Sequence, residues 1–149
     1  MRVWLVAALF VLGFGCRRGG EPAPAQQAPP AIPAAEAAKA DDRPVIVAFG
    51  DSLTAGPGVD ADASYPAVLQ TELDARGLRY RVVNAGISGD TTGGGLARVD
   101  SVIAHKPQIV ILELGANDGL RGLPLESTRA NLEQIIVAFQ RAGARVVLA

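Results

Sequence analysis

The chain is predicted to hold one α/β domain, in which a parallel β-sheet is flanked by helices. Short apolar runs alternate along the chain with segments of helical periodicity, and Gly-rich polar segments follow the apolar runs. This alternation requires parallel strands joined by right-handed crossovers. Because ligands bind such sheets at the carboxyl ends of the strands, we expect the functional site among the Gly-rich segments.

The first strand and the first helix have the clearest signals. Residues 45–49 are all apolar, which indicates a strand buried on both faces. Residues 64–76 carry apolar side chains at helical spacing. Ser64 suits the N-cap of this helix, Pro66 suits its first turn, and Gly77 suits its end.

The remaining elements continue the alternation. The further strands are expected at 80–83, 109–114 and 145–149. The helix between the first two of these strands is marked by Leu96, Val99, Val102 and Ile103. The helix before the last strand is marked by Leu125, Leu132, Ile135, Ile136 and Phe139. Pro107 closes the first of these helices, and Gly143 suits the C′ position of the second. The polar segments 50–58, 84–95 and 115–122 then share one edge of the sheet.

Composition excludes several classes of protein. Apolar residues make up 49% of the chain and charged residues 19%, which is too hydrophobic for disorder over the whole length. The formal net charge of −1 provides no basic field for nucleic acid. A single Cys excludes an intramolecular disulfide framework and a Cys-rich metal site.

Residues 1–16 are typical of a secretory signal peptide. The apolar stretch 3–14 would span about 18 Å as a helix, too short for a bilayer core of about 30 Å. Small residues precede Cys16, and this ending resembles a bacterial lipobox. The resemblance implies lipidation of Cys16 and an exported lipoprotein on the periplasmic face of a bacterial membrane. A cleaved signal of a periplasmic or secreted protein, and an inert buried thiol, are the alternatives.

Residues 17–43 are predicted to form a linker. The segment is rich in Ala and Pro, and Pro at this density blocks both helix and sheet. An extended chain of about 3.1 Å per residue would hold the following domain away from a membrane. The foldable part of the chain is therefore 44–149.

Each of the first three strands is followed by a group suited to acyl chemistry. Ser52 lies at a strand-to-helix turn, where a serine can act as a nucleophile beside its own backbone amide. The glycines within 84–92 can expose amide donors, and the side-chain amide of Asn117 can donate to an oxyanion. Each feature alone is common in structural turns, but their ordered occurrence is far more specific.

The residues 50–53 (GDSL), 84–91 (NAGISGDT) and 115–118 (GAND) resemble the first three blocks of the GDSL (SGNH) hydrolases. The resemblance extends over 45–149 and is to the bacterial branch of arylesterases, acyl-CoA thioesterases and lysophospholipases. It implies a flavodoxin-like sheet, a Ser52 nucleophile, and an oxyanion hole of the Ser52 and Gly89 amides with the Asn117 side chain. The implied substrates are small acyl or aryl esters and thioesters, and lysophospholipids as a further class.

The family's fourth block, Asp-x-x-His, is absent from the sequence. The single His, His105, precedes the third strand at its amino end, roughly 20 Å from the opposite edge, whereas a base must come within about 3 Å of the serine. The apolar strand 145–149 also has no following helix to cover it. We therefore expect 44–149 to be the N-terminal part of the domain, with the base His and its Asp beyond residue 149, and little activity from these residues alone.

The sequence is also compatible with two other functions, a non-catalytic binding module and an inactive fragment of a hydrolase. Ser52, Thr54, Ser88, Thr91 and the run 93–95 could cradle a phosphate or sugar in a non-catalytic binding module. Carboxylates near the functional edge are expected to cap turns or bond loop amides, so no metal and no cofactor is predicted; they are Asp51, Asp90, Glu113 and Asp118.

Overall fold

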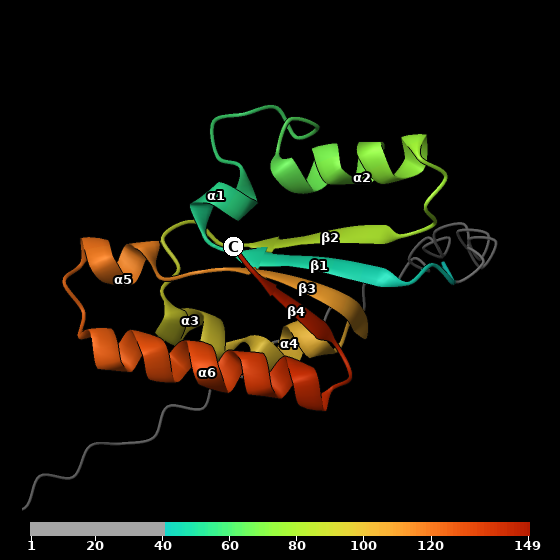
Figure 1. Ribbon diagram of the computed structural model, residues 1–149. Helices are drawn as coiled ribbons and strands as arrows, with labels where there is room; N and C mark the ends of the chain where they lie inside the picture. The colour runs from blue at the N-terminus through green and yellow to red at the C-terminus, as the bar shows by residue number, and fades with distance from the viewer. Residues whose placement is uncertain (1–40) are drawn as a thin grey trace, which may run out of the picture. The chain divides into compact units, whose positions relative to one another are not determined.

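A computed structural model describes residues 41–149 and shows a sheet with helices on both faces (Figure 1). The predicted signal peptide, its Cys16 and almost all of the predicted linker lie outside the described residues. The strands are β1 (Val45–Gly50), β2 (Arg81–Gly86), β3 (Pro107–Glu113) and β4 (Arg145–Leu148). The helices are α1 (Ser52–Ala55), α2 (Tyr65–Ala75), α3 (Thr92–Ala97), α4 (Val99–Ile103), α5 (Ala116–Leu120) and α6 (Leu125–Arg141).

The sheet is parallel throughout, with strand order β2-β1-β3-β4. Helices α1 and α2 lie on one face, and α3, α4 and α6 lie on the other (Figure 1). This arrangement confirms the predicted parallel sheet with flanking helices. The turns that follow β1, β2 and β3 share the carboxyl edge, because parallel strands all end on the same side.

The core lies where β1 and β3 meet α6. Every residue of β1 is buried, as its apolar sequence predicted, because the strand has neighbours on both sides and helices on both faces. Phe49 packs edge-on against Phe139 of α6, with ring centroids 5.5 Å apart. Val47 and Leu112 complete this contact with no exposed surface.

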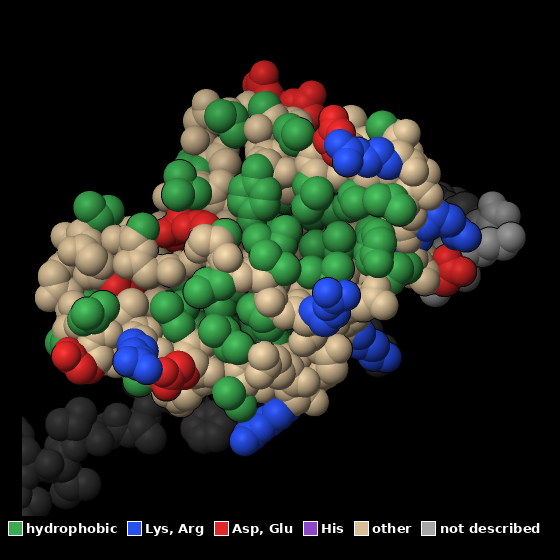
Figure 2. Space-filling model, in the orientation of Figure 1, with side chains coloured by type: hydrophobic (Ala, Val, Ile, Leu, Met, Phe, Trp, Pro, Cys, Tyr) green, Lys and Arg blue, Asp and Glu red, His purple; other side chains and the backbone are tan. Residues whose placement is uncertain are grey.

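Strand β4 lies at an edge of the sheet, and its side chains Val147 and Leu148 are 52% and 60% exposed. Figure 2 shows hydrophobic side chains gathered over the sheet between α2 and α6. The open apolar strand that the sequence predicted is therefore present. No helix within the described residues is long and apolar enough to cross a membrane.

The helix expected around 96–103 is instead two short helices, α3 and α4, with a break at Arg98. Helix α3 also includes the glycines 93–95, which the sequence placed in a loop. A Cβ atom at Gly94 would collide with the Asp90 carboxylate, and one at Gly95 would collide with Leu114. These glycines permit close packing of a helix, a role that propensity alone does not predict.

Strand β2 is longer than predicted and runs to Gly86 rather than to residue 83. The polar Asn84 interrupts the apolar pattern, but its side chain donates to the Thr54 carbonyl at 3.0 Å and accepts from the Gly86 amide at 2.9 Å. Strand β3 also starts earlier, at Pro107, where the missing N–H is tolerated at the first position of a strand. The sequence did not predict the longer β2 and β3 because Asn, Gly and Pro, which occupy three of the added positions, are unfavourable in strands.

Candidate active site

Ser52 begins α1, directly after the turn that ends β1. Asp51 is the N-cap, and its Oδ1 accepts a hydrogen bond from the Leu53 amide at 3.0 Å. Gly56 ends the helix in the left-handed conformation, with φ of 75°. Ser52 is partly exposed, and its hydroxyl has no hydrogen-bond partner among residues 41–149. Ser52 therefore has the strand-to-helix position that the sequence predicted.

Asn117 lies in the first turn of α5, after β3. Its Nδ2 donates to Asp51 Oδ2 at 2.8 Å, and Asp51 is only 1% exposed. This bond joins the turn that presents Ser52 to the turn that presents Asn117. A side-chain amide has two N–H donors, so one bond to Asp51 leaves the second available for a ligand.

Gly89 lies in the loop after β2 and has φ of +79°, a conformation that strains any residue with a Cβ. Its carbonyl accepts a hydrogen bond of 2.6 Å from Arg121 Nη2. The same loop is joined to the end of β1 because the Ile87 amide donates to the Gly50 carbonyl at 3.0 Å. The structure therefore brings the loops of Ser52, Gly89 and Asn117 to the same edge.

Glu113, the last residue of β3, is hydrogen-bonded to the first turn of α1. Its Oε2 accepts from Thr54 Oγ1 at 3.0 Å and from the Asp51 amide at 3.3 Å. Burial raises the pKa of the Glu113 carboxyl, and the negative charge of Asp51 raises it further. The two hydrogen bonds act to lower this pKa but do not outweigh the rise. The Tyr65 hydroxyl lies 3.3 Å from Thr54 Oγ1, and burial raises the pKa of Tyr65. Polar groups of α1, α2 and β3 thus meet at Thr54, two residues after Ser52.

Asp118 joins α5 to α3 and α6. It is 2% exposed and accepts the Thr92 amide at 2.8 Å, the Thr92 hydroxyl, and the Thr128 hydroxyl at 3.2 Å. Burial acts to raise the pKa of Asp118, but the hydrogen bonds from Thr92 and Thr128 together outweigh it, and the pKa is lowered. Asn131 also donates to the Thr92 hydroxyl at 3.1 Å, so the cluster has little freedom to move.

Residues 48–149 match the model of the GDSL-like lipase/acylhydrolase family. The chain belongs to this family. Esterase TesA of Pseudomonas aeruginosa is 44% identical over 104 residues, which are 69% of this chain and 52% of that protein. An arylesterase of Vibrio mimicus is 43% identical, with the same coverage. The thioesterase 1/protease 1/lysophospholipase L1 of Escherichia coli is 42% identical over 69% of this chain and 49% of its own.

The family's solved structures share the fold described above. The SGNH-hydrolase family esterase AlinE4 has a TM-score of 0.68 and 47% identity, and the match covers 72% of this chain and 58% of AlinE4. The crystal structure of TesA has a TM-score of 0.68 at 44% identity, covering 70% and 58% of the two chains. The chain spans about half the length of the curated relatives that it matches.

His105 lies in an exposed turn between α4 and β3, at the amino edge of the sheet. Ser52 follows the carboxyl end of β1, which runs parallel to β3. The two side chains are therefore at opposite edges, as predicted, and His105 is not the base of this site.

Three of the four carboxylates act as the sequence predicted. Asp51, Glu113 and Asp118 accept backbone amides of turns and helix starts. Asp90 instead forms an ion pair of 2.8 Å with Arg98, which sequence reasoning missed. The two residues are eight apart, on a loop and at a helix break, so no periodicity connects them.

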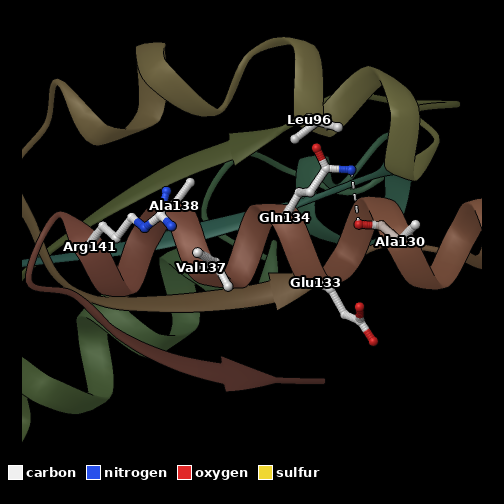
Figure 3. Close-up of a pocket in the computed structure, with 7 residues that line it drawn as sticks. All are labelled: Leu96, Ala130, Glu133, Gln134, Val137, Ala138 and Arg141. Atoms are coloured by element: carbon white, nitrogen blue, oxygen red, sulfur yellow. Dashed lines mark hydrogen bonds between the residues drawn. The ribbon is translucent and has the colours of Figure 1, made fainter.

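Two surface hollows of the described residues lie away from Ser52. One of about 590 Å³ lies along α6 beside α3 (Figure 3), and its lining is Leu96, Ala130, Glu133, Gln134, Val137, Ala138 and Arg141. Another, of about 390 Å³, lies between α6 and β4. Neither includes a residue of the turns that follow β1 and β2. The candidate site is therefore defined by its polar groups rather than by either hollow.

Proposed function

We propose that the protein is a serine esterase and thioesterase that acts on small acyl or aryl esters, with lysophospholipids as a further substrate class. The observation that carries this proposal is the 2.8 Å hydrogen bond between Asp51 and Asn117. This bond holds the side-chain amide of Asn117 against the turn that presents Ser52. The names of the relatives, which are esterase, arylesterase and thioesterase, support the same chemistry.

In the proposed reaction, Ser52 Oγ bonds to the carbonyl carbon of the ester, and the carbonyl π electrons move onto its oxygen. The amides of Ser52 and Gly89 and the Asn117 Nδ2 donate to that oxyanion, and each donor contributes about 3 kcal/mol to the barrier reduction. Collapse of the intermediate expels the alcohol or thiol and leaves an acyl-serine, which water hydrolyses.

The reaction also needs a base to take the Ser52 proton and return it to the leaving group. We propose that the Asp-x-x-His block expected beyond residue 149 supplies this base and its orienting carboxylate. The activity is thus proposed for the full-length protein.

The alternative of a non-catalytic phosphate or sugar site has less support. Thr54 is fully buried, and its hydroxyl is bonded to Glu113. The run 93–95 is helical, and the amides of Gly94 and Gly95 donate to Thr91. Three of the donors that would cradle an anion, the Thr54 hydroxyl and the amides of Gly94 and Gly95, are therefore used within the protein.

The catalytic proposal is tested with a nitrophenyl ester of a short fatty acid and the full-length protein. Replacing the nucleophile, Ser52→Ala, is expected to lower kcat by on the order of 10⁶-fold, because the triad acts as a unit. A fluorophosphonate probe should label the wild-type protein and not S52A. The matched control is Ser127→Ala, which removes an exposed serine of α6 and should leave both readouts unchanged. Turnover by folded S52A, or ligand binding without turnover by the wild type, would contradict the proposal.

We also propose that Cys16 is lipidated and anchors the protein to the periplasmic face of a bacterial membrane. The support is the apolar stretch 3–14 and the small residues before the single Cys. Mass spectrometry of the mature N-terminus should find a diacylglyceryl group on Cys16. An unmodified chain that starts elsewhere would reject the anchor.

A further inference from the structure

Arg98 lies at the break between α3 and α4, and its guanidinium group makes contacts that the proposed reaction does not use. Nε donates to Asp90 Oδ2 at 2.8 Å, Nη1 to the Ala85 carbonyl at 2.8 Å, and Nη2 to the Gly50 carbonyl at 3.1 Å. The group also lies 4.3 Å from the centroid of the Phe49 ring. All of these partners lie at the carboxyl edge of the sheet.

The contacts of Arg98 join the segments that carry two of the three proposed oxyanion donors, the amides of Ser52 and Gly89. Gly50 is two residues before Ser52, and Asp90 directly follows Gly89. Ala85 lies near the end of β2, from which the Gly89 loop departs. A single planar group therefore sets the spacing between the end of β1, the end of β2 and the loop that carries the Gly89 amide.

The environment of Arg98 suits a rigid connection rather than a surface charge. Its side chain is 18% exposed, and that of Asp90 is 10% exposed. Hydrogen bonds between charged groups at this depth are stronger than neutral ones, and the guanidinium fork fixes their directions. Gly94 makes room for the arrangement, because a Cβ at that position would collide with the Asp90 carboxylate.

The Gly89 loop needs such a connection because its own backbone is permissive. Gly86 lies at the start of this loop and Gly89 lies within it. Glycine loses more conformational freedom on ordering than any other residue. An oxyanion donor is effective only about 2.7–3.1 Å from the oxyanion, and a displacement of about 1 Å can lower the rate about 100-fold. Arg121 Nη2 also donates to the Gly89 carbonyl, at 2.6 Å.

We propose that Arg98 is a positioning residue for the oxyanion hole. Through its bonds to Asp90 and to the carbonyls of Gly50 and Ala85, Arg98 fixes the position of the Gly89 amide relative to Ser52. The inference rests on the proposed esterase function. It predicts that Arg98 acts on kcat rather than on substrate binding, since the oxyanion exists only in the intermediate and its flanking transition states.

The test measures kcat and KM for a short-chain nitrophenyl ester with the full-length protein. Arg98→Ala is expected to lower kcat about 100-fold and to change KM less than about threefold. Arg98→Lys keeps the charge but loses the fork, so kcat should fall about tenfold. The matched control is Arg76→Ala, because Arg76 pairs with Glu72 on the exposed side of α2, and this variant should keep both constants.

Chemical rescue separates positioning from a merely structural role. Methylguanidinium, at a concentration well below that which unfolds the protein, should restore part of the kcat of R98A, whereas methylammonium should not. Restored kcat with unchanged thermal stability supports the proposal. Lower stability of R98A with wild-type kcat in the folded fraction overturns it. If R98A does not fold, R98K decides: a lower kcat at unchanged KM supports the proposal, and a wild-type kcat overturns it.

The outcome for Ser52 keeps the two hypotheses apart. If the wild-type protein does not turn over the ester, or S52A remains active, the proposed function fails whatever Arg98 does. If the wild type is active, S52A is inactive, and R98K and R98A keep wild-type kcat, only the role of Arg98 is rejected.

Discussion

The two edges of the sheet both carry acidic and basic side chains, but they use them in different ways. At the carboxyl edge, Asp51 and Asp118 are almost fully buried and accept bonds from residues far away in the chain. Asp51 joins β1 to α5, and Asp118 joins α5 to α3. These bonds position the turns of the candidate site relative to one another.

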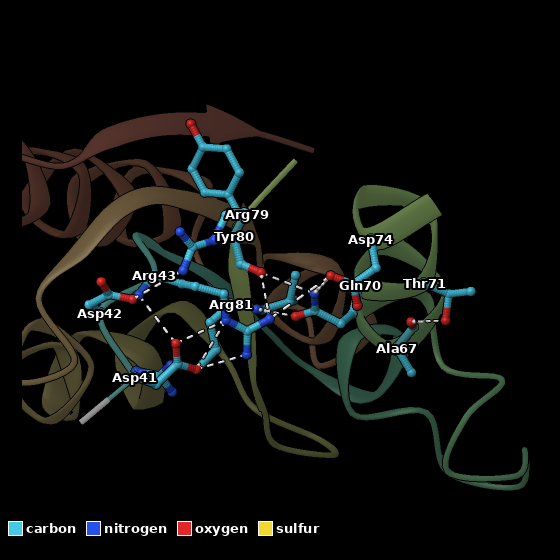
Figure 4. Close-up of polar contacts among 11 residues, drawn as sticks. Asp41, Asp42, Arg43, Ala67, Gln70, Thr71, Asp74, Arg79, Tyr80 and Arg81 are labelled. Carbon is cyan, nitrogen blue, oxygen red and sulfur yellow. Dashed lines mark hydrogen bonds and ion pairs between the residues drawn. The ribbon is translucent and has the colours of Figure 1, made fainter. Parts of the chain in front are cut away.

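At the amino edge, the charged groups form ion pairs that are partly or largely exposed (Figure 4). Arg43 lies 2.8 Å from Asp41, with side chains 32% and 37% exposed, and Arg79 lies 3.4 Å from Asp42, with side chains 78% and 84% exposed. The hydrogen bond from the Arg43 side chain lowers the pKa of Asp41 to about 2. The Arg79–Asp42 pair joins the start of the described chain to the segment that leads into β2, whereas the Arg43–Asp41 pair lies within that start.

The difference shows that burial, and not the number of charges, decides what a polar contact contributes. An exposed ion pair contributes about 0–1 kcal/mol, because water and salt screen it. A buried group that loses its hydrogen-bond partner costs about 1–3 kcal/mol, and more when it is charged. The carboxyl edge should therefore be sensitive to single substitutions, and the amino edge should tolerate them.

The largest effect is expected where the backbone itself is close-packed at the carboxyl edge. A Cβ at Gly86 would collide with the backbone nitrogen of Ala55, in the helix that Ser52 begins. Gly86→Ala should therefore lower the free energy of unfolding by more than about 3 kcal/mol, measured by urea denaturation. Gly119→Ala is the matched control, since nothing lies within 4 Å of its added Cβ, and it should change stability by less than about 1 kcal/mol. Equal stability of the two variants would show that the edge is not closely packed.

An intermediate effect is expected for the buried carboxylate. Asp118→Asn replaces an acceptor oxygen with an N–H donor facing Thr92 or Thr128, and should cost about 2–3 kcal/mol at pH 7. Because the folded pKa of Asp118 is lowered, its stabilisation is present above the unfolded pKa and is lost as pH falls through the folded pKa. The difference between wild type and variant should thus shrink below about pH 4. A difference independent of pH would contradict the ionised role of Asp118.

The smallest effect is expected at the amino edge. Arg79→Ala breaks the exposed pair with Asp42 and should change the free energy of unfolding by less than about 0.5 kcal/mol. The same urea denaturation measures it, at low and high salt. A loss comparable to that of D118N would reject the contrast between the edges.

The sequence predicted the fold well because the signals were local. The uninterrupted apolar run of β1, the periodicity of α6 and the stop at Gly143 each describe how a segment is buried, and the structure confirms all three. It missed the end of β2 and the start of α3, because Asn84 and the glycines 93–95 are unfavourable there in isolation. Tertiary contacts compensate for both.

The candidate site divides in the same way. The chain alone placed Ser52, Gly89 and Asn117 after successive strands, and parallel strands bring such residues to one edge whatever the strand order. The partners of Asp51, Asp118 and the pair of Asp90 with Arg98 were decided only by the tertiary structure. The physical reason is that periodicity and turn chemistry act over a few residues. Hydrogen bonds between segments instead depend on which strands are neighbours and on how closely their turns pack.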